Sequence, residues 1–351
     1  MFELTGIIQW VANIVTGISN AIGLPQIVLD VILILIIAVA IFAFLMLMAL
    51  YLIWMERKVS GHIQDRLGPM MTGWHGWAQT IADSLKLLQK EDIVVANADR
   101  KVHYWAPIVT FTACFAVYAV IPFGKGMLAA DVNIGILYIL AITTFTTLSL
   151  LMAGWATNNK YALLGGMRSA SQIISYEVPL TLSILGVVMM AGTLSMGKFV
   201  ELQGPYIWKW YVWPQFLGFC IYLIASTAEL NRTPFDLPEA EQELVAGFNI
   251  EYSGMKFAMF FLAEFLNMFT VGAVTTTLFL GGWQPPFPAL AIIPSWVWFL
   301  GKSLFVVFLI MWFKWTYPRL RVDHLLSFAW KVLLPLSFIN LILTAIGITI
   351  F

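Results

Sequence analysis

The chain has 351 residues and no net charge, because its 19 basic residues balance its 19 acidic ones. Hydrophobic residues make up 60% and charged residues only 11%, whereas soluble proteins carry roughly 25% charged residues. A soluble fold of this size could not bury so much apolar surface, so the composition predicts an integral membrane protein. The balanced charge excludes a basic nucleic-acid-binding module.

Eight apolar runs reach the length of about 20 residues that a helix needs to cross a bilayer. They are continuous rather than alternating, which excludes membrane β-strands. Residues 1–25 are weakly amphipathic and predict an interfacial segment. We therefore expect one all-α, multi-pass membrane domain over residues 1–351. The predicted spans are 28–55, 104–123, 134–156, 173–197, 211–230, 255–282, 293–316 and 328–350.

Basic residues are unequally divided between the two sides of the predicted membrane domain. Fifteen of the 19 lie in or beside the loops that follow the odd-numbered spans, and four lie on the other side. The positive-inside rule places the basic loops in the cytoplasm and both termini outside. Length and tryptophan-rich outer loops favour a bacterial cytoplasmic (inner) membrane over the mitochondrial inner membrane. No repeat is visible, which weighs against an inverted-repeat transporter.

Metal and redox ligands are scarce. The two cysteines, Cys114 and Cys220, lie in separate apolar runs, and none of the four histidines lies in the middle of a span. This pattern is unsuited to an iron–sulfur cluster, a structural zinc ion or a membrane haem. We expect no metal ion and no redox centre in this chain.

The first long inner stretch begins with Glu56-Arg57-Lys58 and runs to residue 102. The charged triplet could simply be a cluster at the membrane interface. However, Gly68-Pro69 predicts a turn, and apolar residues recur at helical spacing over residues 74–90. The spacing predicts an amphipathic surface helix lying in the interface plane. Such a helix could border a mouth through which a lipid-like molecule enters sideways.

Two acidic residues fall within predicted spans. Glu177 lies about one turn into span 4 and could simply pair with Arg168. Glu264 lies roughly ten residues into span 6, with no basic residue within seven positions. Because an ionisable residue is costly inside a membrane, a deep carboxylate without a local partner is a candidate for proton transfer.

The densest acidic stretch covers residues 228–254, with six acids and a single basic residue, Arg232. A helix over 238–250 would place Glu239, Glu243 and Glu251 on one face. Clustered carboxylates raise one another's pKa values and can exchange protons near neutral pH. A site for a hard cation and a solvated acidic helix are the alternatives.

The short loop after span 7 carries Arg319 and Arg321. These arginines could be ordinary positive-inside residues, or they could form a docking surface for a soluble partner.

These stretches, taken together and in this order, resemble the H subunit family of proton-pumping NADH–quinone oxidoreductase, respiratory complex I. The resemblance covers essentially the whole chain. Its most specific part is NRTPFDLPEAEQELVAGFNIEYSG, from Asn231 to Gly254. Further matching segments are Glu56-Arg57-Lys58, Gln64 to Pro69, Asp83 to Asp92, Arg168 to Glu177 and Pro318 to Asp323.

The resemblance implies eight spans with surface helices, in a subunit that joins the membrane arm to the hydrophilic arm. It implies that the chain forms the membrane part of a quinone chamber, which quinone enters from the lipid. It implies that NADH, FMN and the iron–sulfur clusters belong to partner subunits. The expected partners are other complex I subunits, quinone and lipid, with no nucleic acid.

The resemblance also implies three groups of site residues and no metal ligand. Arg319, Arg321 and Asp323 correspond to a subunit-docking surface. The acidic proton path corresponds to Glu177, Glu229, Glu239, Glu241, Glu243, Glu251 and Glu264. The quinone entrance and chamber correspond to Glu56, Arg57, Gln64, Arg66, Gly68, Pro69, Asp83, Lys86, Arg232, Phe235 and Asp236. Gln242 and His324 differ from the residues common in the family, so the resemblance does not define the docking surface at these two positions.

Three alternatives remain at this point. Two are relatives of the same class, namely the membrane subunit of an energy-converting hydrogenase and a ferredoxin-linked quinone reductase. The intact 60–101 segment favours the quinone enzyme over the hydrogenase. The third, from a different class, is a stand-alone cation/proton antiporter, which the absence of repeats and of paired deep charges disfavours.

Overall fold

The computed structural model describes residues 26–238 and 241–350, and within these ranges helices joined by loops are the regular structure, with one isolated β-bridge. The predicted all-α class is thereby confirmed. The predicted interfacial segment, residues 1–25, lies outside the described residues. The α-helices are α2 (Gln26–Ile63), α3 (Gln79–Gln89), α4 (Arg100–Ala116), α5 (Gly135–Ala156), α6 (Lys160–Ala191), α7 (Met196–Gln203), α8 (Phe216–Glu229), α9 (Glu241–Leu244), α10 (Gly254–Phe279), α11 (Ser295–Thr316), α12 (Val322–Phe328) and α13 (Leu334–Ile350).

Seven of the described helical segments are long and apolar enough to cross a membrane, which confirms a multi-pass membrane protein. The fifth predicted span, 211–230, differs because its helix, α8, has only 14 residues. Residues 211–215 form a turn against the end of α10 instead, where the Val212 amide donates to the Phe279 carbonyl over 3.0 Å. The eight predicted spans thus correspond to seven long helices and one short one.

Capping residues explain why two helices begin before the predicted spans. The Asp99 carboxylate accepts bonds from the Lys101 and Val102 amides at the start of α4. The Asn159 side chain accepts a bond from the Tyr161 amide at the start of α6. A side chain that takes up these free amide groups stabilises the first helical turn. As a result, nearly all of the expected loop 157–172 is helical, and Glu177 lies well inside α6 rather than near its start.

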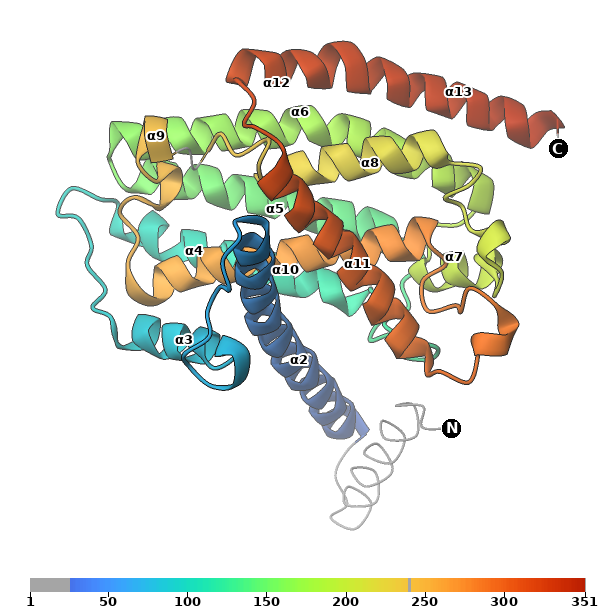
Figure 1. The fold of residues 1–351 in the computed structure, drawn as a ribbon, viewed down its shortest axis with the longest axis horizontal. Helices are drawn as coiled ribbons and strands as arrows, with labels where there is room; N and C mark the ends of the chain where they lie inside the picture. The colour runs from blue at the N-terminus through green and yellow to red at the C-terminus, as the bar shows by residue number, and fades with distance from the viewer. Residues whose placement is uncertain (1–25, 239–240, 351) are drawn as a thin grey trace.

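The long helices form a bundle in which α4, α5, α6, α8 and α10 run side by side (Figure 1). Helices α2 and α11 cross this layer obliquely, and α12 with α13 follows the edge of the bundle along α6 (Figure 1). Helix α10 is the best-enclosed of the described spans, since 67% of its most apolar window is buried. The N-terminal half of α2 extends away from the bundle.

Glycines bring the backbones of neighbouring segments into direct contact, as small residues do in membrane helix packing. A Cβ atom added to Gly272 of α10 would lie 2.8 Å from the Ser303 carbonyl oxygen of α11. A Cβ atom on Gly165 of α6 would lie 2.7 Å from the Cα atom of Gly247. These contacts fix α10 against α11, and α6 against the segment that leads into α10.

The predicted surface helix over 74–90 is shorter than expected. Its first turn is a separate 3-10 segment, Trp74–Gly76, and α3 begins only at Gln79. The backbone breaks because Gly73, His75 and Gly76 all have positive φ angles, of 72°, 51° and 75°, which an α-helix does not accommodate. A surface helix is present at the predicted place, but it covers residues 79–89 of the predicted 74–90.

Candidate functional site

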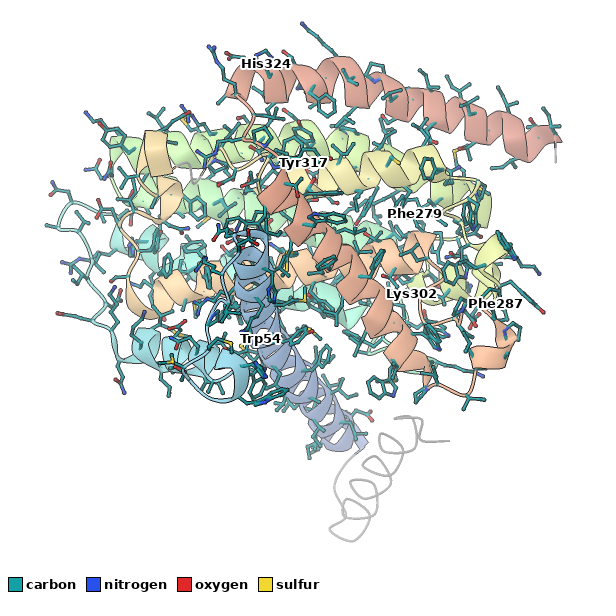
Figure 2. All side chains as sticks on the ribbon, in the orientation of Figure 1. Trp54, Phe279, Phe287, Lys302, Tyr317 and His324 are labelled. Atoms are coloured by element: carbon teal, nitrogen blue, oxygen red, sulfur yellow. The ribbon has the colours of Figure 1, made fainter. Side chains whose placement is uncertain are left out.

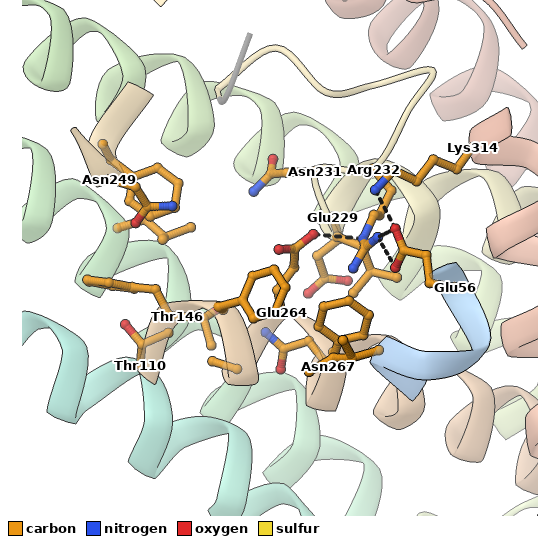
Figure 3. A pocket seen from close by; sticks show the side chains of 18 of the residues that line it. Glu56, Thr110, Thr146, Glu229, Asn231, Arg232, Asn249, Glu264, Asn267 and Lys314 are labelled. Carbon is orange, nitrogen blue, oxygen red and sulfur yellow. Dashed lines mark hydrogen bonds and ion pairs between the residues drawn. The ribbon is translucent and has the colours of Figure 1, made fainter. Parts of the chain in front are cut away.

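A cavity of about 400 Å³ lies where α2, α10 and α11 meet the loop that follows α8. This volume falls within the range of small-molecule sites. Four phenylalanines of α10 supply much of its apolar wall, and Figure 3 shows charged and amide side chains around the same space. The four are Phe257, Phe260, Phe261 and Phe265.

Arg232 is the centre of a cluster of charges beside this cavity and is only 3% exposed. Its guanidinium binds both carboxylate oxygens of Glu56, at 2.7 and 2.6 Å. Its Nε atom lies 2.7 Å from a carboxylate oxygen of Glu264, and the group stacks over the Phe265 ring at 4.7 Å. Glu264 therefore has a basic partner 32 positions away in the sequence, although it has none within seven positions.

Lys314 of α11 completes the cluster, with its ammonium 2.6 Å from Glu56. Two acids and two bases from three helices and a loop thus neutralise one another (Figure 3). Paired deep charges are therefore present, and the expectation that they are absent is wrong. Pairing offsets the large cost of removing each ion from water, and removal of one member leaves the others without compensation.

A second, smaller cavity of about 50 Å³ adjoins the first and extends between α5, α6, α8 and α10. Thr146, Glu229, Leu230 and Asn267 line both cavities. Glu229 therefore lies at their junction. Glu177 of α6 is close enough to interact electrostatically with Glu229. Glu264 and Glu229 both line the larger cavity, whereas Glu177 lines neither cavity.

Most of the predicted entrance residues gather at the end of α2 and on α3, outside the cavity wall. Arg57, which also lines the cavity, binds Asp83 of α3 at 2.6 Å. Gln64 and Arg66 are exposed and bind each other at 2.7 Å. Lys86 is exposed as well. Gly68, with a φ of 65°, and Pro69 belong to the tight turn that returns the chain beside α2.

The acidic stretch does not form the single helix predicted over 238–250. Among the described residues of this stretch, Glu241–Leu244 is α-helical, and a 3-10 turn follows at Gly247–Asn249. Positive φ angles at Val245 and Gly247 separate the two. Glu243 binds Arg168 at 2.6 Å, so Arg168 does not pair with Glu177, and Glu251 accepts a bond from Asn159 at 2.8 Å.

Two further acids of this stretch are Glu239 and Glu241. Glu239 lies outside the described residues, and so does the side chain of Glu241. Because the backbone breaks after Leu244, Glu243 and Glu251 do not share the predicted helix face, and the part of that prediction concerning Glu239 lies outside the described residues. Glu243 and Glu251 instead bind α6 near its first turns.

The first half of the loop is fixed to α6 by one glutamine. The buried Gln172 side-chain amide donates to the carbonyls of Ala228 and Phe235, both at 2.8 Å. Phe235 is itself buried against Tyr176, with ring centroids 5.5 Å apart. Phe235 thus secures the loop rather than lining the cavity.

The loop is also bonded to the segment after α11. Asp236 binds Arg319 at 3.1 Å, and burial raises the pKa of the Asp236 carboxyl although Arg319 opposes the shift. Arg321 and Asp323 are both largely exposed and form a pair at 3.3 Å. Of the predicted docking residues, Arg319 thus binds the described part of the loop.

Several cavity residues were missed from the sequence. Lys314 was counted only as a positive-inside residue, although it binds Glu56 directly. Asn267 carries a detectable signal, because it follows Glu264 by three positions and so shares its helix face. Thr110, Thr146 and Asn249 come from three distant segments, and no spacing in the sequence connects them. Within the described ranges, no group of three His, Cys, Asp or Glu residues could hold a metal ion.

Fold and site together define a multi-pass helical membrane protein with a charged, aromatic-lined cavity. The family model for NADH dehydrogenase matches residues 35–345. The H subunit of NADH-quinone oxidoreductase from Brevibacillus brevis is 52% identical over 299 residues, covering 85% of this chain and 88% of the relative. The corresponding protein of Carboxydothermus hydrogenoformans is 49% identical over 326 residues, covering 93% and 92%. That of Dehalococcoides mccartyi is 50% identical over 302 residues, covering 86% and 83%.

The chain belongs to the H subunit family of NADH–quinone oxidoreductase, a membrane component of complex I. It is thus part of a multi-subunit oxidoreductase. The predicted family is confirmed, and membership of such a complex decides against a stand-alone antiporter.

Proposed function

We propose that the larger cavity receives the head group of a quinone and that the adjoining carboxylates couple its reduction to proton movement. The observation that carries this proposal is the combination of phenylalanine rings with the cluster of Glu56, Arg232, Glu264 and Lys314 at one cavity. A quinone has an apolar ring and two carbonyl oxygens. It suits a site with aromatic walls and a few polar groups.

Reduction of a quinone to a quinol takes two electrons and two protons. The electrons would come from NADH by way of FMN and iron–sulfur clusters in partner subunits. Negative charge that develops on the quinone oxygens would attract the cations Arg232 and Lys314. Because interactions are strong where water is scarce, this attraction would weaken the hold of those cations on Glu56 and Glu264. The two carboxylates would then take up protons more readily.

Protons would pass from Glu264 to Glu229, at the junction of the two cavities, and on to Glu177. From there they would continue to neighbouring membrane subunits. The loop 231–254 is the proposed moving element, with Glu239, Glu241, Glu243 and Glu251 as its acids. Its first half is secured by Gln172, whereas Glu243 binds Arg168 as an ion pair about half exposed. An ion pair of that kind is weak and suits a contact that breaks and re-forms.

Quinone would enter from the lipid between α2, α3 and α10. Arg57 and Asp83 join α2 to α3 at this place, and Gln64, Arg66, Gly68, Pro69 and Lys86 border it. Arg319, Arg321 and Asp323 would dock a hydrophilic-arm subunit. The protein would reside in a bacterial cytoplasmic membrane with both termini outside, in line with the unequal distribution of basic residues.

The test uses the assembled complex in proteoliposomes, with NADH–quinone activity and proton pumping measured together. We expect Glu264→Gln and Glu243→Gln to lower pumping, and Glu264→Gln to raise the KM for quinone as well. Glu201→Gln, which changes an exposed acid on α7, is the matched control and should leave both activities unchanged. Wild-type pumping in both test variants would contradict the proposed path.

Binding is tested separately with a photoreactive quinone. We expect it to label the segment 257–267 of α10, and excess unlabelled quinone to compete with the label. Labelling confined to other subunits would contradict a chamber in this chain.

A further inference from the structure

Lys302 of α11 directs its ammonium group onto the backbone at the far end of α10. The Nζ atom donates to the carbonyl oxygens of Leu280, Gly282 and Gln284, at 2.7, 3.1 and 2.7 Å. An ammonium group has three N–H donors, so each of them has a carbonyl acceptor. The group also lies 4.0 Å from the centre of the Trp210 ring, within the range of a cation–π contact. Its bonding capacity is therefore fully used within the protein.

A fully buried glutamine fixes the same end of α10 from another side. The Gln203 side-chain nitrogen donates to the Thr277 carbonyl at 2.9 Å, and its oxygen accepts a bond from the Gly281 amide at 2.9 Å. The oxygen also accepts a bond from the Tyr211 amide at 3.3 Å. The last carbonyls of a helix lack partners within the helix, and a cation is favourable near them. At the end of α10, Gln203 supplies a donor for the Thr277 carbonyl and Lys302 supplies the cation.

The loop 280–284, which Lys302 and Gln203 both bind, is tightly packed. Gly281 and Gly282 both have positive φ angles, of 73° and 51°. A Cβ atom on Gly281 would lie 2.5 Å from the Trp210 indole nitrogen, and one on Gly282 would lie 2.4 Å from Val200. Trp210 and Val200 thus pack closely against the two glycines of the loop that supplies the carbonyls for Lys302.

We propose that Lys302 and Gln203 form a clasp that sets the axial position and rotation of α10, so that Lys302 is a positioning residue for Glu264. Sixteen residues separate Glu264 from Leu280, which corresponds to about 24 Å along a helix axis. In Figure 2, Lys302 lies on the side of Phe279 and Phe287, away from Trp54 and Tyr317. The clasp therefore lies apart from the chamber and is connected to it through α10, which carries Glu264, and through α11, which carries Lys314.

Axial position matters because the Glu264–Arg232 contact is short and directional. The distance is 2.7 Å, and Arg232 is held independently of α10 by Glu56. A shift of α10 by about 1 Å would move Glu264 and the phenylalanine wall relative to Arg232, and displacements of this size can cost about 100-fold in rate. This step rests on the proposed function, in which these groups surround the quinone.

The experiment compares Lys302→Ala with wild type in the assembled complex, measuring kcat and KM for quinone. NADH oxidation by a water-soluble electron acceptor reports on the partner subunits in the same samples. We expect the KM for quinone to rise about tenfold or more, while the soluble-acceptor activity stays unchanged. Lys198→Ala, which removes an exposed lysine of α7, is the matched control and should have no effect.

Chemical rescue separates a clasp from simple loss of packing. Propylammonium replaces the atoms that Lys302→Ala removes and retains three donors, so it should lower the KM back towards the wild-type value. Propan-1-ol has nearly the same size but no charge, and it should not. Equal recovery with both compounds, or no recovery with propylammonium, would overturn the assignment to a bound ammonium group.

A second variant is needed in case the Lys302→Ala complex assembles poorly. Lys302→Met keeps most of the side-chain volume and removes the donors, and the same rise in KM is expected. An unchanged KM in either assembled variant would exclude the clasp.

Comparison with Glu264→Gln distinguishes failure of the clasp from failure of the proposed chamber. If Glu264→Gln affects quinone kinetics but neither Lys302 variant does, only the clasp fails. If Glu264→Gln has no effect, the proposed chamber itself fails.

Discussion

The two ends of α10 hold a cation in contrasting ways. At the chamber end, Arg232 is neutralised by the carboxylates of Glu56 and Glu264 beside a cavity. At the far end, Lys302 is bound by three backbone carbonyls in a tightly packed loop. A carboxylate can change its charge by binding a proton, and a backbone carbonyl cannot. One end is thus built to respond to charge, and the other is built to stay fixed.

The largest effect is expected from removing the cation at the responsive end. Arg232→Met leaves Glu56 and Glu264 enclosed with only Lys314 as a partner, and breaking a buried pair in this way costs about 3–5 kcal/mol. We expect little assembled complex, a lower melting temperature and loss of quinone reductase activity. Native gels and thermal unfolding measure these effects.

The control for this variant is Lys198→Met, because Lys198 is an exposed residue of α7 and its loss should leave assembly and melting unchanged. A fully assembled Arg232→Met complex with wild-type melting would show that the charges at this end are not interdependent.

A smaller effect is expected from crowding the fixed end. Gly282→Ala places a Cβ atom against Val200 at a positive φ angle, and strain of this kind costs about 1–3 kcal/mol. We expect a lower melting temperature of the purified complex and a raised KM for quinone. Gly301→Ala is the matched control, since a Cβ atom there meets nothing within 4 Å.

Unchanged melting in Gly282→Ala would mean that the loop 280–284 can relax. The contrast between a rigid end and a responsive end would then disappear.

The smallest effect is expected at the half-exposed pair between α2 and α3. Asp83→Asn weakens the contact with Arg57, and pairs of this exposure contribute about 0–1 kcal/mol. We expect a modest rise in the KM for quinone that disappears at high salt, because mobile ions screen the wild-type pair as well. A large effect that persists at high salt would assign Asp83 a direct contact with the substrate.

Composition and apolar run length were enough to predict the helical membrane class and the approximate place of each span. Helix ends were predicted less well because single side chains decide them. Asn159 starts α6 thirteen residues before the predicted span, and the positive φ angle of Val245 divides a segment that reads as one acidic helix. Neither effect alters the hydrophobic pattern from which spans are read.

The carboxylates beside the chamber were recognisable because acids are rare in apolar helices, but their partners were not. Arg232 reaches Glu56 across 176 positions, and Lys314 reaches Glu56 across 258. Such contacts arise from helix packing and leave no local spacing signal. The role of Lys302 could not be predicted either. Its acceptors are backbone carbonyls, which every residue type carries.

The contact between Gly165 and Gly247 limits how this sequence can change over evolutionary time. At Gly165 the side chain is a hydrogen atom because the backbone of Gly247 occupies the space of a Cβ atom. Gly247 also has a φ of 57°, which L-residues seldom adopt. Any side chain at Gly165 would collide with backbone, which a second mutation on a side chain cannot relieve. We therefore expect glycine at both positions in relatives that keep this packing of α6.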